Sequence, residues 1–168
     1  IMDALMDAAR SGKNVSVFIE VKARFDEEAN LRWGEKLSKA GAKVFYSFPG
    51  LKVHSKIAWI RRKEGNSYKT YTYLSTGNFN EDTALVYSDF GLFSANNHYT
   101  VEVKKIFDFL ESGQKPKSPF RHLLVGKVNL REELTKLIEF EINEAKQGKQ
   151  ALLILKLNSL EDSEMIRI

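Results

Sequence analysis

The order strand, helix, strand near the start of the chain constrains the fold more than any other feature. Residues 15–21 form an alternating, β-branched run that is typical of a strand. Residues 27–40 carry apolar side chains at helical spacing after Asp26, a suitable helix cap, and residues 44–48 predict a second strand. Because strands joined by a helix run parallel with a right-handed crossover, the sequence predicts an α/β fold.

Two segments follow these strands directly and are therefore expected on one rim of the sheet. Arg24 comes just after the first strand, and Pro49 and Gly50 come just after the second. In parallel sheets functional loops collect outside the carboxyl ends of the strands. The sequence therefore predicts a functional site at this rim.

A hairpin is predicted next, with arms at residues 56–62 and 68–75 and a polar turn at 63–67. Its pairing brings the start of the first arm, near His54, close to the end of the second, at Gly77. Side chains two apart on a strand share a face, so His54 and Lys56 place an imidazole beside an ammonium. This arrangement suits phosphoryl chemistry, although a structural, hydrogen-bonded histidine is the common alternative for so short a motif.

Residues 77–84 predict a tight turn into a short helix. Backbone N–H groups and the amides of Asn78 and Asn80 can then face an anion, while an ordinary Asn/Gly turn is the alternative. Residues 87–93 predict another strand. Residues 97–111 predict a helix with four inward side chains, namely Val101, Ile106, Phe109 and Leu110.

The last third of the chain predicts a linker at 113–119 and the start of a second α/β unit. Its expected elements are a strand at 123–127, a helix at 130–146 capped by Asn129, a strand at 151–157 and a helix beginning at Asn158 and Ser159. The chain starts inside one predicted helix and stops inside another, so we expect it to be part of a longer protein.

Composition narrows the function further. The chain has 168 residues, 43% of them hydrophobic, and no cysteine, which excludes disulfides, thiolate metal sites and cysteine nucleophiles. No apolar stretch approaches the roughly 20 residues of a membrane-spanning helix, and no secretory signal is present. A net charge of +4 favours anionic partners. The candidate site lies in a basic region that includes Lys13, Lys22, Arg24, Lys52, Lys56, Arg61, Arg62 and Lys63.

The His-X-Lys motif at His54 and Lys56, followed by Gly77 and Asn80, resembles a half-site of the phospholipase D superfamily. Arg61 stands where that pattern has an aspartate, a departure that speaks against ordinary phosphodiester hydrolysis.

Longer strings resemble bacterial polyphosphate kinase, which makes polyphosphate from ATP through a phosphohistidine. The resemblance implies a phospholipase D-like mixed sheet flanked by helices, with a first catalytic domain at 1–112, a linker at 113–120 and the truncated start of a second, similar domain at 121–168. The matching strings are ARFDEEAN at 23–30, PGLKVHSK at 49–56, TGNFNEDTA at 76–84, YSD at 87–89 and KLNSL at 156–160.

The resemblance also implies roles for individual residues. His54 matches the phosphorylated histidine, Tyr87 a nucleotide-contacting position, and Arg24 an arginine at the magnesium and phosphate site. Because a guanidinium has no lone pair to give a cation, Arg24 is expected to clamp phosphate beside Mg²⁺. Lys52 and Lys56 supply further positive charge. Asn78 and Asn80 are expected to donate to the phosphate in the same site.

The implied cofactors are ATP and Mg²⁺, and the implied partners are ATP or ADP and inorganic polyphosphate, with no nucleic acid. A cytoplasmic homo-oligomer, with peripheral membrane association of the parent protein, is expected. Two other functions remain open: a phospholipase D-like phosphodiesterase, and a non-enzymatic module that binds polyanions. His98 and His122 have no companion ligand at metal-binding spacing, so structural roles are expected for them.

Overall fold

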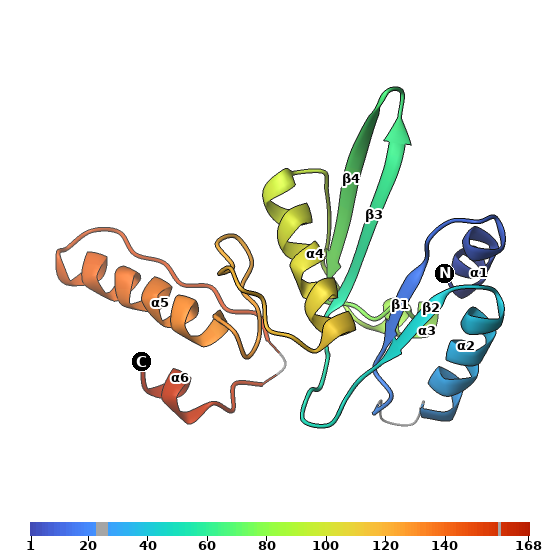
Figure 1. Ribbon diagram of the computed structural model, residues 1–168. Coiled ribbons are helices and arrows are strands. Elements are labelled where there is room, and N and C mark those ends of the chain that lie inside the picture. Colours follow the sequence, from blue (N-terminus) through green and yellow to red (C-terminus); the bar gives the residue numbers. More distant parts are fainter. Residues whose placement is uncertain (23–26, 158) are drawn as a thin grey trace. The chain divides into compact units, whose positions relative to one another are not determined.

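The computed structural model describes residues 1–22, 27–157 and 159–168. These fall into two compact units, Ile1–Ser118 and Pro119–Ile168. Arg24 and Asp26, the predicted phosphate clamp and helix cap, lie outside the described residues. Figure 1 shows the helices and strands of both units.

The predicted parallel unit is confirmed. Strand β1 (Ser16–Ile19) pairs in parallel with β2 (Lys43–Tyr46), and α2 (Glu27–Lys39) connects them (Figure 1). Gly34 lets α2 lie close to β2, because a Cβ at this position would stand 2.2 Å from the hydroxyl oxygen of Tyr46.

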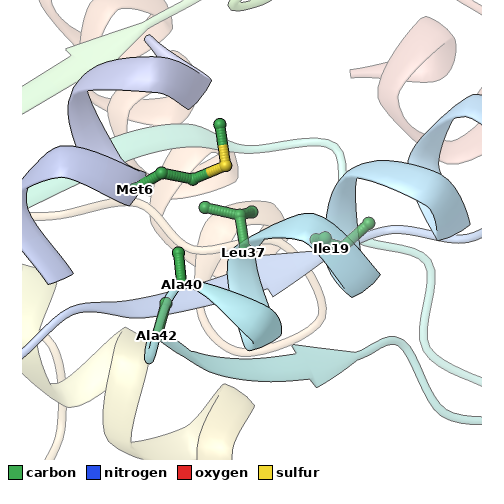
Figure 2. Packing of buried hydrophobic residues seen from close by; sticks show 5 residues of the cluster. All are labelled: Met6, Ile19, Leu37, Ala40 and Ala42. Carbon is green, nitrogen blue, oxygen red and sulfur yellow. The ribbon is translucent and has the colours of Figure 1, made fainter. Parts of the chain in front are cut away.

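The core of this part lies between helices α1 (Met2–Arg10) and α2 and the parallel strands. Leu37 is completely buried there. Burying such side chains is the main favourable term in folding, at about 25 cal/mol per Å² of apolar surface. Figure 2 shows the five buried members of this cluster, which are Met6, Ile19, Leu37, Ala40 and Ala42.

The predicted hairpin is also confirmed, with longer arms and a shorter turn. Strand β3 (Lys56–Glu64) pairs antiparallel with β4 (Ser67–Ser75), which leaves two residues in the turn. Glu64 pairs with Ser67 at the end of the ladder, and its carboxylate accepts a hydrogen bond of 2.7 Å from the Tyr71 hydroxyl.

A third strand and a helix complete the first unit. Strand β5 (Gly91–Ser94) pairs with residues 72–75 of β4, so in the described residues the outer half of the hairpin has no strand beside it. Helix α4 (Asn97–Ser112) packs against β3 and β4 (Figure 1), and the Trp59 indole donates a hydrogen bond of 3.0 Å to the carbonyl of Thr100.

Two expectations for this region are wrong. The strand predicted from residue 87 begins at Gly91, because Tyr87 instead ends helix α3 (Glu81–Val86) and donates its N–H to the carbonyl of Thr83. Val101 is 47% exposed and does not face the core. The buried side of α4 carries Thr100, Glu102, Val103 and Leu110.

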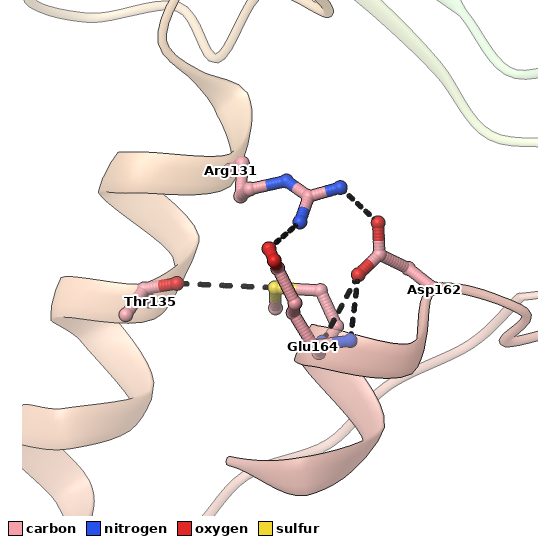
Figure 3. A network of polar contacts seen from close by, with 5 residues as sticks. Arg131, Thr135, Asp162 and Glu164 are labelled. Atoms are coloured by element: carbon pink, nitrogen blue, oxygen red, sulfur yellow. Dashed lines mark hydrogen bonds and ion pairs between the residues drawn. The ribbon is translucent and has the colours of Figure 1, made fainter.

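The second unit contains helices α5 (Leu130–Lys146) and α6 (Ser163–Arg167). The Arg131 guanidinium pairs with Asp162 and Glu164, and Asp162 caps α6 by accepting from the N–H groups of Glu164 and Met165 (Figure 3). Helix α6 therefore starts at Ser163, later than predicted, and Asn158 lies outside the described residues.

The two strands predicted for this unit do not form. At 123–127 the chain turns: Asn129 accepts from Val125 N–H and donates to the carbonyl of Leu123, so the expected cap holds the turn together. Residues 151–157 pair with no strand in the described part of the chain, and the Leu152 N–H bonds to Glu141. Period-two alternation predicts an extended backbone, but a strand also needs a neighbour.

Candidate functional site

The loop that leads into His54 is held by one carboxylate. Glu20 follows β1 directly and accepts hydrogen bonds from the Ser47 hydroxyl at 2.7 Å and from the backbone N–H groups of Val53 at 2.7 Å and Lys22 at 3.0 Å. Partial burial raises the pKa of Glu20, but these hydrogen bonds and the charge of Lys52 outweigh it, so the pKa lies below its ordinary value. Glu20 therefore stays ionised at neutral pH.

His54 and Lys56 lie side by side, as the sequence predicts. The Lys56 Nζ atom is 3.1 Å from each ring nitrogen of His54. His54 precedes β3, whose first residue is Lys56, so the ring stands at the entrance to the strand and is exposed. An ammonium can only donate, and a protonated imidazole has no lone pair, so this contact requires a neutral ring.

The charges around His54 favour the neutral ring. The charge of Lys56, partial burial and the charge of Lys52 together lower the pKa of His54 below its ordinary value. Burial likewise lowers the pKa of Lys56, against the opposing effect of Asp89. The lowered pKa favours an uncharged His54 imidazole at neutral pH, and the lone pair of such a ring accepts the hydrogen bond from Lys56.

Asp89 is a carboxylate whose charge acts on Lys56. It accepts a hydrogen bond of 3.3 Å from the Thr76 hydroxyl, and Gly77 lies against it so closely that a Cβ there would stand 2.3 Å from a carboxylate oxygen. The Arg61 guanidinium, at the position where the phospholipase D pattern has an aspartate, lies 4.3 Å from the centre of the Tyr68 ring. The carboxylate that acts on Lys56 is thus Asp89, and not a residue at position 61.

The two asparagines lie in the turn that precedes α3. Asn80 caps this helix, because its side-chain oxygen accepts from the N–H of Thr83 at 3.1 Å. In the described part of the chain the Asn80 amide N–H groups donate to no acceptor, and Asn78 is exposed, so both residues have donor groups at the surface. Tyr87, at the other end of α3, is 63% exposed.

The groups that hold metal ions in proteins include the side chains of histidine, aspartate and glutamate. Outside 23–26 and 158, no three histidine or carboxylate side chains are grouped so that they could hold a metal ion. The Glu20 carboxylate, which is close to the site, already accepts three hydrogen bonds from the protein. Mg²⁺ commonly binds through substrate phosphates with only one or two protein carboxylates, so a group of three protein ligands is not needed to hold it.

Sequence patterns alone missed Glu20 and Asp89. Glu20 is the one charged residue in the alternating run at 15–21. Because acidic side chains are rarely buried without a partner, its place near the end of a strand could have indicated a specific contact. Asp89 has no local signal, because its relation to Lys56 depends on the pairing of β4 with β5.

A solved structure shares this arrangement of helices and strands. The crystal structure of polyphosphate kinase from Porphyromonas gingivalis matches 99% of this chain and 28% of its own with a TM-score of 0.84 and 46% sequence identity. The parallel unit, the antiparallel hairpin and the covering helices define an α/β protein of phospholipase D-like architecture.

Sequence relatives lead to the same family. Residues 1–116 match the family model Polyphosphate kinase C-terminal domain 1, and residues 123–168 match Polyphosphate kinase C-terminal domain 2. Polyphosphate kinases from Vibrio parahaemolyticus and Escherichia coli are 44% and 42% identical over 166 residues. The chain belongs to the polyphosphate kinase family, and it spans 24% of the length of these relatives.

Proposed function

We propose that this chain supplies one catalytic half of a polyphosphate kinase that transfers the γ-phosphate of ATP reversibly to polyphosphate through a phosphohistidine at His54. The observation that carries the proposal is the His54 imidazole, whose two ring nitrogens each lie 3.1 Å from the ammonium nitrogen of Lys56. A histidine nucleophile needs a free lone pair and a phosphate needs a nearby cation, so in the proposal the Lys56 ammonium turns from the ring to the incoming phosphate before His54 attacks. Family membership supports the same chemistry.

In the proposed reaction, the lone-pair nitrogen of His54 bonds to the γ-phosphorus while the bond to the bridging oxygen breaks. ADP leaves with that electron pair. A terminal oxygen of polyphosphate then attacks the phosphohistidine and releases the imidazole, and the reverse sequence forms ATP. Phosphoryl transfer passes through a loose transition state, so the residues act mainly by positioning and by stabilising charge.

The surrounding residues receive roles in the same proposal. Lys56 and Lys52 stabilise phosphate charge, since their fields already reach the His54 ring. Asn78 and Asn80 donate amide N–H groups, Tyr87 contacts the nucleotide, and Arg24 clamps phosphate by analogy with the family. Since Mg²⁺ usually binds through substrate phosphates, the proposal assigns it to the nucleotide, and no step depends on it.

The proposal extends to the organisation of the parent protein. Its domains are placed at 1–112 and 121–168 with a linker at 113–120. The proposal includes a cytoplasmic homo-oligomer with peripheral membrane association, and ATP, ADP and polyphosphate as partners, with no nucleic acid. Family membership supports the nucleotide and polyphosphate partners. No helix among the described residues is long and apolar enough to cross a membrane.

Labelling with γ-³²P-ATP tests the central step. The complete polypeptide that carries this chain should acquire an acid-labile, base-stable phosphate, and His54→Ala should abolish it. His98→Gln, a substitution at another histidine of the same unit, serves as the matched control and should label normally. Retention of the acid-labile phosphate on His54→Ala would remove His54 from the mechanism. The isolated chain should turn over little, since it spans a quarter of its relatives.

A further inference from the structure

We infer that Glu20 is a positioning residue for His54: its carboxylate fixes both ends of the loop that delivers the imidazole to the phosphate. The inference rests on the proposed function, which makes His54 the nucleophile. The loop runs from Ser47 to Val53, and Glu20 accepts a hydrogen bond of 2.7 Å from each of these two residues. One side chain from another strand therefore closes the loop.

Glu20 is itself well anchored. It follows the last residue of β1, and Ser47 follows the last residue of β2. The parallel ladder continues across this point, because the Ser47 N–H donates to the carbonyl of Ile19 at 3.0 Å and the Val21 N–H donates to the Ser47 hydroxyl at 3.1 Å. The Asn30 side chain donates to the Glu20 carbonyl at 3.2 Å. The carboxylate is thus attached to the end of the parallel pair of strands.

The loop between the two fixed ends is compact. The Leu51 N–H donates to the Phe48 carbonyl at 3.1 Å, and Gly50 turns the chain with a φ of +86°. The Phe48 ring meets the Phe109 ring of α4 edge to face, with 6.5 Å between the ring centres. The loop is therefore held by Glu20 on one side and by α4 on the other.

His54 lies between two fixed points of the backbone. Val53, immediately before it, is bonded to Glu20, and Lys56, two residues after it, is paired with Ser75 in the hairpin. The imidazole thus has a fixed backbone and a small number of side-chain orientations. A displacement of about 1 Å in a reacting group lowers a rate by roughly 100-fold, so this fixation bears directly on the chemical step.

Glutamate suits this task better than glutamine. The three groups that contact the carboxylate all donate, and an ionised carboxylate only accepts. In Glu20→Gln one oxygen becomes an NH₂ group, which must face a donor and lose at least one of these hydrogen bonds. The side chain keeps its size, so the parallel unit and its core remain packed.

The experiment compares Glu20→Gln with Glu35→Gln in the complete polypeptide. Glu35 is an exposed glutamate of α2 and serves as the matched control. The rate constant of His54 phosphorylation is measured by rapid quench with saturating γ-³²P-ATP, together with the dissociation constant of the nucleotide and the melting temperature. Hydrogen exchange of residues 48–55, followed by mass spectrometry, reports the loop independently of activity.

We expect Glu20→Gln to slow phosphorylation by about 10- to 100-fold and to speed exchange in residues 48–55, with nucleotide affinity within about twofold of the unsubstituted protein. Glu35→Gln should change none of these quantities. Ser47→Ala, which removes one of the three donors and leaves Val53 bonded to Glu20, should have a smaller effect in the same direction.

The possible outcomes separate this inference from the function on which it rests. Phosphorylation of Glu20→Gln at the unsubstituted rate, or a loss matched by an equal loss of folded protein, overturns the positioning role alone. Absence of phosphohistidine from the unsubstituted polypeptide overturns the proposed function, and the role of Glu20 with it. If Glu20→Gln does not fold, a normal rate and normal exchange in Ser47→Ala likewise overturn the inference.

Discussion

The ammonium nitrogen of Lys56 stands 3.1 Å from both ring nitrogens of His54. A neutral imidazole carries its lone pair on one nitrogen only, so one of these two contacts is a hydrogen bond and the other is proximity. The lysine has two effects on the histidine: it keeps the ring uncharged, and it marks the place where a phosphate oxygen would find a cation.

Removing the ammonium should make His54 easier to protonate. In Lys56→Gln the pKa of His54 should rise toward its ordinary value of 6.5, because the largest cause of its lowering is gone. A group with a lowered pKa stays neutral further into acid, so the acidic limb of phosphorylation should move to higher pH in the variant. NMR titration of ¹³C-labelled histidine measures the shift directly.

Lys52→Gln provides a graded comparison for this prediction, since Lys52 contributes the smallest of the three causes. Its effect on the pKa of His54 should have the same sign and a smaller size. An unchanged or lower pKa of His54 in Lys56→Gln would contradict the electrostatic account of the pair.

Asn80 has a structural role that can be separated from a catalytic one. Asn80→Ala removes the cap of α3 and should cost about 1 kcal/mol of stability, whereas Asn80→Ser keeps a capping oxygen and should cost little. Both variants lack the amide N–H donors. Loss of phosphorylation in Asn80→Ser with normal urea unfolding would support a contact with phosphate, and normal phosphorylation would leave Asn80 as a cap alone.

Gly77 should tolerate no side chain while Asp89 is present. In Gly77→Ala the new Cβ would meet three side-chain atoms of Asp89 at 2.3–2.8 Å, so the Asp89 side chain must move. Crowding of this kind typically costs about 1–3 kcal/mol. The cost is measured by denaturant unfolding. It should shrink when Gly77→Ala is made in Asp89→Gly, and an equal cost in both backgrounds would show that the clash is not the cause.

The core of the parallel unit should depend strongly on Leu37. Leu37→Ala removes a side chain with no exposed surface and should lower the free energy of unfolding by about 2–5 kcal/mol. Leu31→Ala, on the same helix at a position that is 44% exposed, should cost clearly less. Urea denaturation of the two variants measures the difference, and similar losses would mean that α2 does not bury the face described above.

Local patterns were sufficient for the elements that periodicity defines. The parallel unit follows from β-branched alternation and helical spacing, and the hairpin follows from two alternating runs around Gly65 and Asn66. The same patterns placed His54 beside Lys56, because side chains two positions apart on an extended backbone point to the same side. They failed at 151–157, where alternation occurs without a neighbouring strand in the described residues.

The remaining features of the site depend on contacts between distant residues. Glu20 and Val53 are separated by 33 positions, and the influence of Asp89 on Lys56 reaches across the sheet. No local spacing encodes such a pair, since the tertiary fold alone brings the two residues together. At Tyr87 the local pattern was misleading. The alternation from this residue predicted a strand, whereas the Tyr87 N–H donates to the Thr83 carbonyl and ends helix α3.

The outer half of the β3–β4 hairpin leaves backbone donors and acceptors open at its margins, within the described residues. Such margins invite strand addition by another chain and hence aggregation. Exposed cations occupy this half of the hairpin at Arg61, Arg62, Lys63 and Lys69. Repulsion between the cations of two copies then disfavours edge-to-edge pairing of their hairpins. The chain can therefore keep a long exposed hairpin with a lower tendency to aggregate.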